Sequence, residues 1–209
     1  MHRFHLLAAV LLIVPAPEFG LAQAPGAASG AHQEARAKPV YHGGLVSPPL
    51  PKPQFTLTDT SGATFNFRSK TEGYVTLLFF GYTNCADICP MHMLYLGRAL
   101  KNLPKTVASR FKVVFVTTDP DRDTPRTLRT WLNNFDADFV GLSGTPAEIR
   151  AAQSAAGVPV AKGAPSYDHS AFIIAYTADN LGHLIYPSGV SEADWLQDLP
   201  QLAKESWSQ

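Results

Sequence analysis

The sequence predicts one α/β domain, with a central mixed sheet covered by helices on both faces, behind an unusual N-terminal segment. Apolar runs alternate with segments of helical periodicity, which is typical of a sheet with helical connections. Hydrophobic residues make up 45% of the 209 residues, enough for a packed core. Eight of the 17 prolines precede residue 54 and set that part of the chain apart. The balance of 17 basic and 17 acidic residues argues against a nucleic-acid-binding protein.

Residues 1–22 are predicted to be a secretory signal peptide. Arg3 precedes an apolar run, Leu6 to Val14, and an A-x-A-like pattern follows at 22–24. The run is far shorter than the ~20 residues of a membrane-spanning helix. A cleaved signal is therefore favoured over an uncleaved membrane anchor, and we expect a periplasmic protein.

Residues 23–53 are rich in Ala, Gly and Pro and are predicted to form a flexible tether. His32 and His42 lie in this segment and are expected to be solvated. The globular domain is expected to occupy residues 54–209.

Strands are predicted from alternating or continuous apolar residues. Two alternating segments around the turn residues 59–62 indicate an N-terminal β-hairpin. Continuous runs indicate strands covered on both faces, and a shorter segment after a second turn indicates one more. The predicted strands are 55–58, 63–67, 75–80, 111–116, 171–176 and 184–186.

Helices are predicted between these strands from helical spacing and from start signals. Thr124-Pro125 is an N-cap followed by proline, and the segments starting at Thr145 and Ser191 resemble capping boxes. The predicted helices are 90–102, one that begins at 125, 146–156 and 192–203. A parallel crossover followed by a closing antiparallel pair indicates a thioredoxin-like arrangement.

The only two cysteines, Cys85 and Cys89, follow the buried strand 75–80 and precede a helix. Ligands bind at this end of a strand in α/β sheets, and a helix start favours thiolate. A structural disulfide is one reading, but it would close too short a loop to stabilise the domain much. The other is a two-sulfur site for a soft metal such as copper(I) or zinc.

A two-sulfur metal site needs a further ligand. The candidates are His92, His169, His183, Met91 and Met93. Met93 fits the buried stripe of its helix, Met91 and His92 are expected to face solvent near the site, and His183 is expected to be structural. His169 directly precedes the strand 171–176 and would approach the cysteines if that strand neighbours 75–80. In the charged loop 119–123 we expect helix capping and an Arg–Asp pair.

Three separated motifs resemble the Sco/SenC copper proteins. They are FGYTxCxDxCP at 80–90, TDPxRDTP at 118–125 and DHS at 168–170, and KPxFxLTD at 52–59 is similar to that family's domain start. One departure is Ala86, where the family usually has proline.

The resemblance implies a thioredoxin-like copper chaperone with Cys85, Cys89 and His169 as copper ligands. It also implies a role in assembling the copper centre of cytochrome c oxidase. The partners would be an oxidase subunit or another copper-accepting protein, with a periplasmic copper donor or a thiol reductant upstream. Asp87 matches a family aspartate between the cysteines.

The alternative is an enzyme, a thiol-disulfide oxidoreductase that uses Cys85 and Cys89 as a redox-active pair without metal. His169 distinguishes the two, because exchange chemistry by the pair does not require it. The C-x3-C spacing, longer than the C-x2-C of many reductases, favours copper.

Overall fold

The computed structural model of the protein describes residues 40–160, 171–205 and 207. The described residues belong to one compact unit, Lys38–Gln209. The predicted signal peptide, the tether up to residue 39 and His169 lie outside them.

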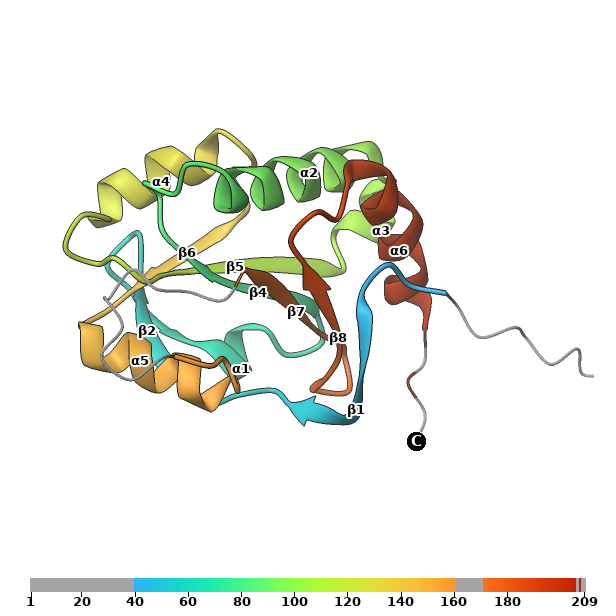
Figure 1. Cartoon of the computed structure of the whole chain (residues 1–209), viewed down its shortest axis with the longest axis horizontal. Helices are drawn as coiled ribbons and strands as arrows, with labels where there is room; N and C mark the ends of the chain where they lie inside the picture. The colour runs from blue at the N-terminus through green and yellow to red at the C-terminus, as the bar shows by residue number, and fades with distance from the viewer. Residues whose placement is uncertain (1–39, 161–170, 206, 208–209) are drawn as a thin grey trace, which may run out of the picture. The chain divides into compact units, whose positions relative to one another are not determined.

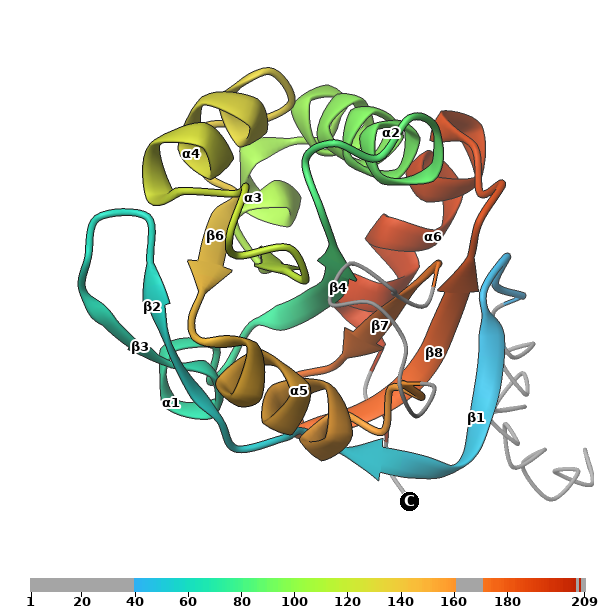
Figure 2. The same ribbon diagram turned by 60° about the vertical axis from the view of Figure 1, so that its left-hand side comes forward.

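One eight-stranded mixed sheet forms the centre of this unit (Figures 1 and 2). Its order is β1-β8-β7-β4-β5-β6-β2-β3; β4, β5 and β6 run parallel and the other neighbours pair antiparallel. The strands are β1 (Gly44–Pro51), β2 (Thr56–Asp59), β3 (Thr64–Asn66), β4 (Val75–Gly81), β5 (Phe111–Thr117), β6 (Val140–Ser143), β7 (Phe172–Tyr176) and β8 (Leu181–Pro187).

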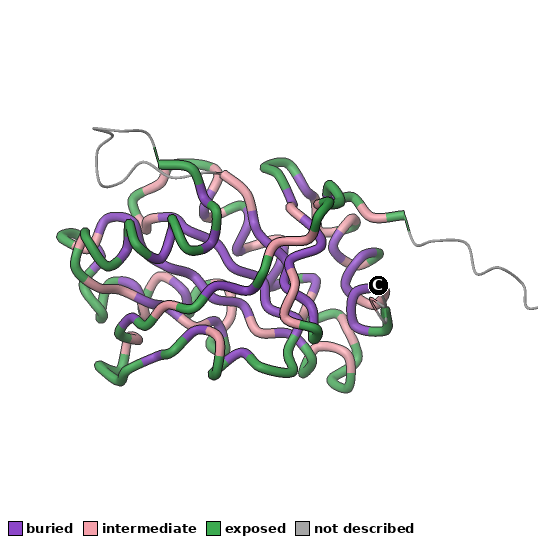
Figure 3. Tube along the Cα trace, turned by 90° about the horizontal axis from the view of Figure 1, so that it is seen from below, coloured by how far each residue is buried: buried purple, intermediate pink, exposed green. Residues whose placement is uncertain are grey.

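Helices cover both faces of the sheet (Figure 1). On one face lie α2 (Ile88–Asn102), α3 (Lys105–Ala108), α4 (Pro125–Asn133) and α6 (Glu192–Lys204); on the other lie α1 (Phe67–Lys70) and α5 (Pro146–Ala155). Alternate residues of each central strand face opposite sides. In β4, Leu77 and Phe79 pack with α2, whereas Leu78 and Phe80 pack with α5. Double coverage is why β4 reads as a continuous apolar run, and Figure 3 shows the central strands buried.

The structure confirms the mixed sheet with helices on both faces and the hairpin β2–β3. Thr124, Thr145 and Ser191 each accept a hydrogen bond at a helix start, as their sequences predict. Strand β6 was not predicted. It has four residues and includes Gly141, so it carries no distinctive apolar run.

The tether prediction is wrong for its last part, because Gly44–Pro51 forms β1. This strand pairs antiparallel with β8, with Leu45 opposite Leu184 and Leu50 opposite Gly182. Prolines made the segment look irregular, but an edge strand tolerates them because one row of its backbone groups has no strand partner. The folded domain therefore begins before residue 54.

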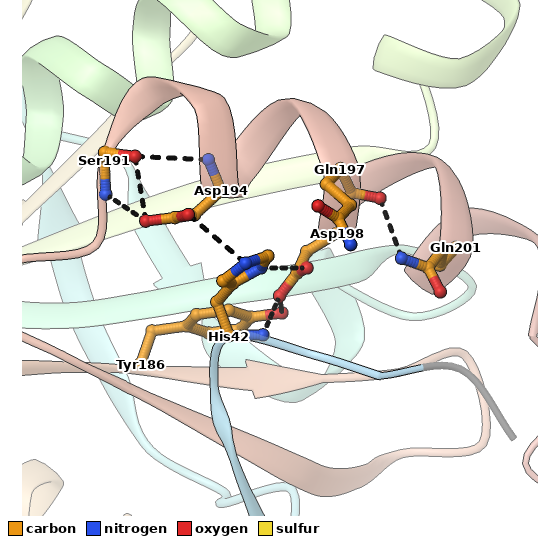
Figure 4. Close-up of polar contacts among 7 residues, drawn as sticks. All are labelled: His42, Tyr186, Ser191, Asp194, Gln197, Asp198 and Gln201. Atoms are coloured by element: carbon orange, nitrogen blue, oxygen red, sulfur yellow. Dashed lines mark hydrogen bonds and ion pairs between the residues drawn. The ribbon is translucent and has the colours of Figure 1, made fainter.

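His42 is exposed, as expected, but it also belongs to a hydrogen-bonded cluster (Figure 4). Its backbone N–H donates to Asp198 Oδ2 at 2.8 Å, and its ring Nδ1 lies 2.9 Å from Asp198 Oδ1. Tyr186 donates to the same buried carboxylate at 3.0 Å, and Asp194 lies 3.3 Å from the other ring nitrogen. The bond to Asp198 raises the pKa of His42 above its ordinary value. The hydrogen bonds of His42 to Asp198 hold the segment before β1 against α6.

No helix within the described residues is long and apolar enough to span a bilayer.

Candidate metal centre

The two cysteines stand where the predicted strand-to-helix turn leaves the sheet. Strand β4 ends at Gly81, and a short loop leads to α2, whose first turn contains Cys89. The Cys85 amide donates to the Tyr82 carbonyl at 3.3 Å, which turns the loop back. The Cys89 amide in turn points at the Cys85 sulfur at 3.5 Å. The C-x3-C spacing therefore brings both sulfurs to one end of α2, and neither cysteine is in a disulfide.

The environment makes the two thiols unequal. Cys89 is fully buried, and burial raises the pKa of its thiol far above the ordinary value. Cys85 is partly exposed. Its partial burial opposes ionisation, but hydrogen bonds from Cys89, Asp87 and Ile88 outweigh this effect and lower its pKa. Amides at a helix start stabilise thiolate in this way. In the metal-free protein, Cys85 is the thiol that ionises first.

Gly81 brings the backbone of β4 against the buried sulfur. A Cβ atom at this position would lie 2.9 Å from Cys89 Sγ and 2.8 Å from a ring carbon of Phe79. Only glycine leaves room for the sulfur, so this position shapes the pocket that holds Cys89.

A hollow of about 460 Å³ lies beside the cysteine turn, between the first turns of α2 and the loop 188–191. Asp87, Met91 and His92 line it. Met91 is exposed, as expected. His92 is not: it is buried, with its ring tilted 5.1 Å from the Phe79 ring, so the expectation of a solvent-facing His92 is wrong.

Two more candidate ligands, Met93 and His183, are structural. Met93 is fully buried in the core, as its place in the helical stripe predicts. His183 lies in β8, where its Nε2 is 2.8 Å from Asp179 and its ring stacks on Trp207. Among the described residues, no three His, Cys, Asp or Glu side chains form a group that could hold a metal ion.

The loop after β5 contains a residue whose contacts the sequence does not reveal. Asp119 pairs with Arg122 at 3.8 Å, as expected. Asp123, however, does not cap α4. Its fully buried carboxylate accepts hydrogen bonds from the Thr83 amide at 3.0 Å, the Thr83 hydroxyl at 2.5 Å and the Thr117 hydroxyl at 2.6 Å. The TDPxRDTP motif therefore reaches the cysteine loop from the neighbouring strand.

Strand β7 pairs antiparallel with β4, so β7 starts at the end of the sheet where β4 finishes. Ile173, near the start of β7, pairs with Phe79, near the end of β4. The beginning of β7 and the loop that carries Cys85 therefore lie at the same end of the sheet. The strand that follows His169 is thus a neighbour of β4, which is the condition for His169 to approach the cysteines. His169 itself lies outside the described part of the chain.

A family model described as SCO1/SenC matches residues 47–204, most of the chain. The chain belongs to the SCO1/SenC family. A putative copper-binding protein of Stutzerimonas stutzeri is 36% identical over 107 residues, which cover 51% of this chain and 52% of that protein. The chain spans about half the length of the first curated relatives that it matches.

Solved Sco structures share the fold of this SCO1/SenC protein. Apo Sco1 of Thermus thermophilus has a TM-score of 0.68 at 32% identity, covering 79% of this chain and 99% of that one. Bradyrhizobium japonicum ScoI with copper bound has a TM-score of 0.62 at 32% identity, covering 73% and 99%. The thioredoxin-like fold that the sequence predicts is thus confirmed.

Proposed function

We propose that this SCO1/SenC protein is a copper chaperone that binds copper through Cys85, Cys89 and His169. The observation that carries the proposal is the unequal thiol pair at the start of α2, with one sulfur buried and one accessible. Two thiolates and an imidazole form a three-ligand set that suits copper(I) and accepts copper(II) with a further ligand. A relative named as copper-binding and a copper-bound Sco structure support this choice of metal.

The position of β7 supports His169 as the third ligand. His169 precedes Phe172, the first residue of β7, by three positions. Three residues span at most ~10 Å. The length of chain between them therefore allows His169 to reach the end of the sheet where the cysteine loop begins, as a third ligand there requires.

The inequality of the thiols suits a protein whose metal is cargo. Cys85 meets an incoming copper ion first, as an accessible sulfur with a lowered pKa. Binding to Cys89 then displaces its proton, because the metal needs the thiolate. On transfer the sequence reverses: an acceptor's ligand replaces Cys85 first, and Cys89 regains its proton as copper leaves.

We propose that the recipient is the copper centre of cytochrome c oxidase, in keeping with the role that the family resemblance implies. We also propose export to the periplasm with cleavage of residues 1–22. The N-terminal residue of the protein recovered from that compartment tests this directly. An intact Met1 on membrane-bound protein would contradict it.

Thiol-disulfide exchange is the second candidate, favoured by the same pair. The Cys85 thiolate would attack a partner disulfide, forming a mixed disulfide and releasing one partner thiolate. Cys89, losing its proton, would then attack Cys85 and release the second partner thiolate. The partner gains two electrons and the pair becomes a disulfide.

Copper titration of the reduced protein separates the two functions. The wild type should bind one copper ion with sulfur-to-copper absorption, and Cys85→Ser, Cys89→Ser and His169→Ala should each weaken binding strongly. His183→Ala is the matched control, because that histidine lies in β8 and bonds Asp179, and the variant should bind copper as the wild type does. Absence of copper binding, together with rapid reduction of a disulfide substrate, would replace the chaperone function by the redox function.

A further inference from the structure

We propose that Asp123 is the positioning residue of the metal centre: its buried carboxylate ties the loop that carries Cys85 to the end of β5 and sets where Cys85 lies relative to Cys89. This inference rests on the copper-binding function proposed above. In this proposal Asp123 contacts neither the ligand sulfur atoms nor the copper ion. It acts through its hydrogen bonds to Thr83.

The contacts of Asp123 show that holding Thr83 is its main interaction. A buried carboxylate is costly unless hydrogen bonds satisfy it, and two of the three bonds that it accepts come from Thr83. Capping does not explain the residue, because Thr124 caps α4. Charge pairing does not explain it either: in the described part of the chain, the ion pair of this loop joins Arg122 to Asp119.

Thr83 lies two residues before Cys85, so anchoring one restrains the other. A second link, from the Thr118 amide to the Gly81 carbonyl at 2.7 Å, ties the same short segment to the end of β5. Cys89 has a different support, since it is fully buried and sits within α2. Cys85 is the partly exposed sulfur on the loop, and its position depends on these links between β4 and β5.

Two substitutions separate geometry from charge. Asp123→Ala removes every bond to Thr83. Asp123→Asn removes the charge but keeps an acceptor for the Thr83 amide and the Thr117 hydroxyl, while its NH2 group can donate to the Thr83 hydroxyl, which then accepts. A positioning role predicts that the alanine variant fails and that the asparagine variant recovers most of the function.

The test is copper titration of reduced, folded protein with its sulfur-to-copper absorption spectrum. We expect Asp123→Ala to bind copper about 10–100-fold more weakly, as loss of an outer-shell partner does, with a shifted absorption band. Asp123→Asn should bind within a few-fold of the wild type. Asp198→Ala is the matched control: Asp198 is equally buried, but its partners are His42 and Tyr186, and its removal should leave affinity and spectrum unchanged.

Folded Asp123→Ala protein with wild-type affinity and spectrum would overturn the assignment, as would an equal loss in Asp198→Ala. If Asp123→Ala does not fold, Thr83→Val replaces it, because it removes the hydroxyl bond from Thr83 to the Asp123 carboxylate and keeps a side chain of nearly the same shape. It should weaken copper binding and shift the absorption band in the same direction, and an unchanged titration and spectrum would overturn the assignment.

A metal-free measurement keeps this inference separate from the proposed function. In glutathione buffers the two thiols exchange with oxidised glutathione, giving the Cys85–Cys89 disulfide and two reduced glutathione molecules. The equilibrium constant should fall in Asp123→Ala, because Cys85 is no longer held beside Cys89, and recover in Asp123→Asn. If the wild type binds no copper, the proposed function fails, and this equilibrium alone decides on Asp123: an unchanged constant refutes its positioning role.

Discussion

Replacing Gly81 by alanine adds one methyl group directly against the buried sulfur of the metal centre. The new Cβ would lie 2.9 Å from Cys89 Sγ, 2.8 Å from Phe79 and 3.2 Å from Phe115. All three neighbours are fully buried. Ordinary carbon contacts are about 3.5–4.0 Å, so the neighbours must retreat by roughly half an ångström or more.

Overpacking of this kind costs about 1–3 kcal/mol of unfolding free energy. The sulfur cannot absorb the displacement freely, because metal–ligand distances hold within about 0.2 Å. We therefore expect Gly81→Ala to lower the copper affinity by about tenfold or more, in the range seen when support for a ligand is lost.

Gly141→Ala is the matched control, since its Cβ would lie 2.7 Å from Leu132 and 2.9 Å from Thr60, equally tight but against no ligand. Chemical unfolding and copper titration of both variants form the assay. Both should lose stability, and only Gly81→Ala should lose copper affinity. If the two variants bind copper equally well, the packing of Gly81 against Cys89 does not govern the site.

Two further predictions concern the titratable side chains of His42 and Lys52, which lie outside the metal centre. The pKa of His42 is raised by its bond to Asp198, so its contribution to stability is present below about pH 6.5 and is lost as the pH rises through the higher folded value. His42→Gln should flatten that part of the melting temperature against pH, and an unaltered curve would contradict the assignment. Lys52 is buried, bonds Thr71 and Thr76, and has its pKa lowered by burial to about 8 from 10.5. The unfolded chain therefore binds more protons between these values, and stability should rise from pH 8 to 10.5 in the wild type but not in Lys52→Met; parallel curves would refute this.

Much of the site could be predicted because its signals are local. The apolar run at 75–80 identifies the central strand, and the C-x3-C spacing places both cysteines at its carboxyl end before a helix. Helical spacing likewise assigned Met93 to the core. The same spacing does not predict the burial of His92, because a neighbour 100° around the helix from a core residue can also be buried, here against Phe79.

The remaining features depend on contacts between distant parts of the chain. Asp123 bonds Thr83 across 40 residues, and nothing in the charged loop 119–123 distinguishes the aspartate that does so. His42 meets Asp198 across 156 residues, so its segment looked like a tether. Such pairings follow from sheet order, which single-segment patterns do not encode.

The pairing of β1 with β8 has a practical consequence for where the protein can be cut. A chain started at residue 54 would lose β1, Lys52 and His42 together, and β8 would become the edge strand of the sheet. An unprotected edge strand can pair with strands of other molecules. Such a shortened protein should therefore self-associate through β8, whereas one started near residue 38 keeps β1, whose prolines hinder pairing along that edge, and stays dispersed.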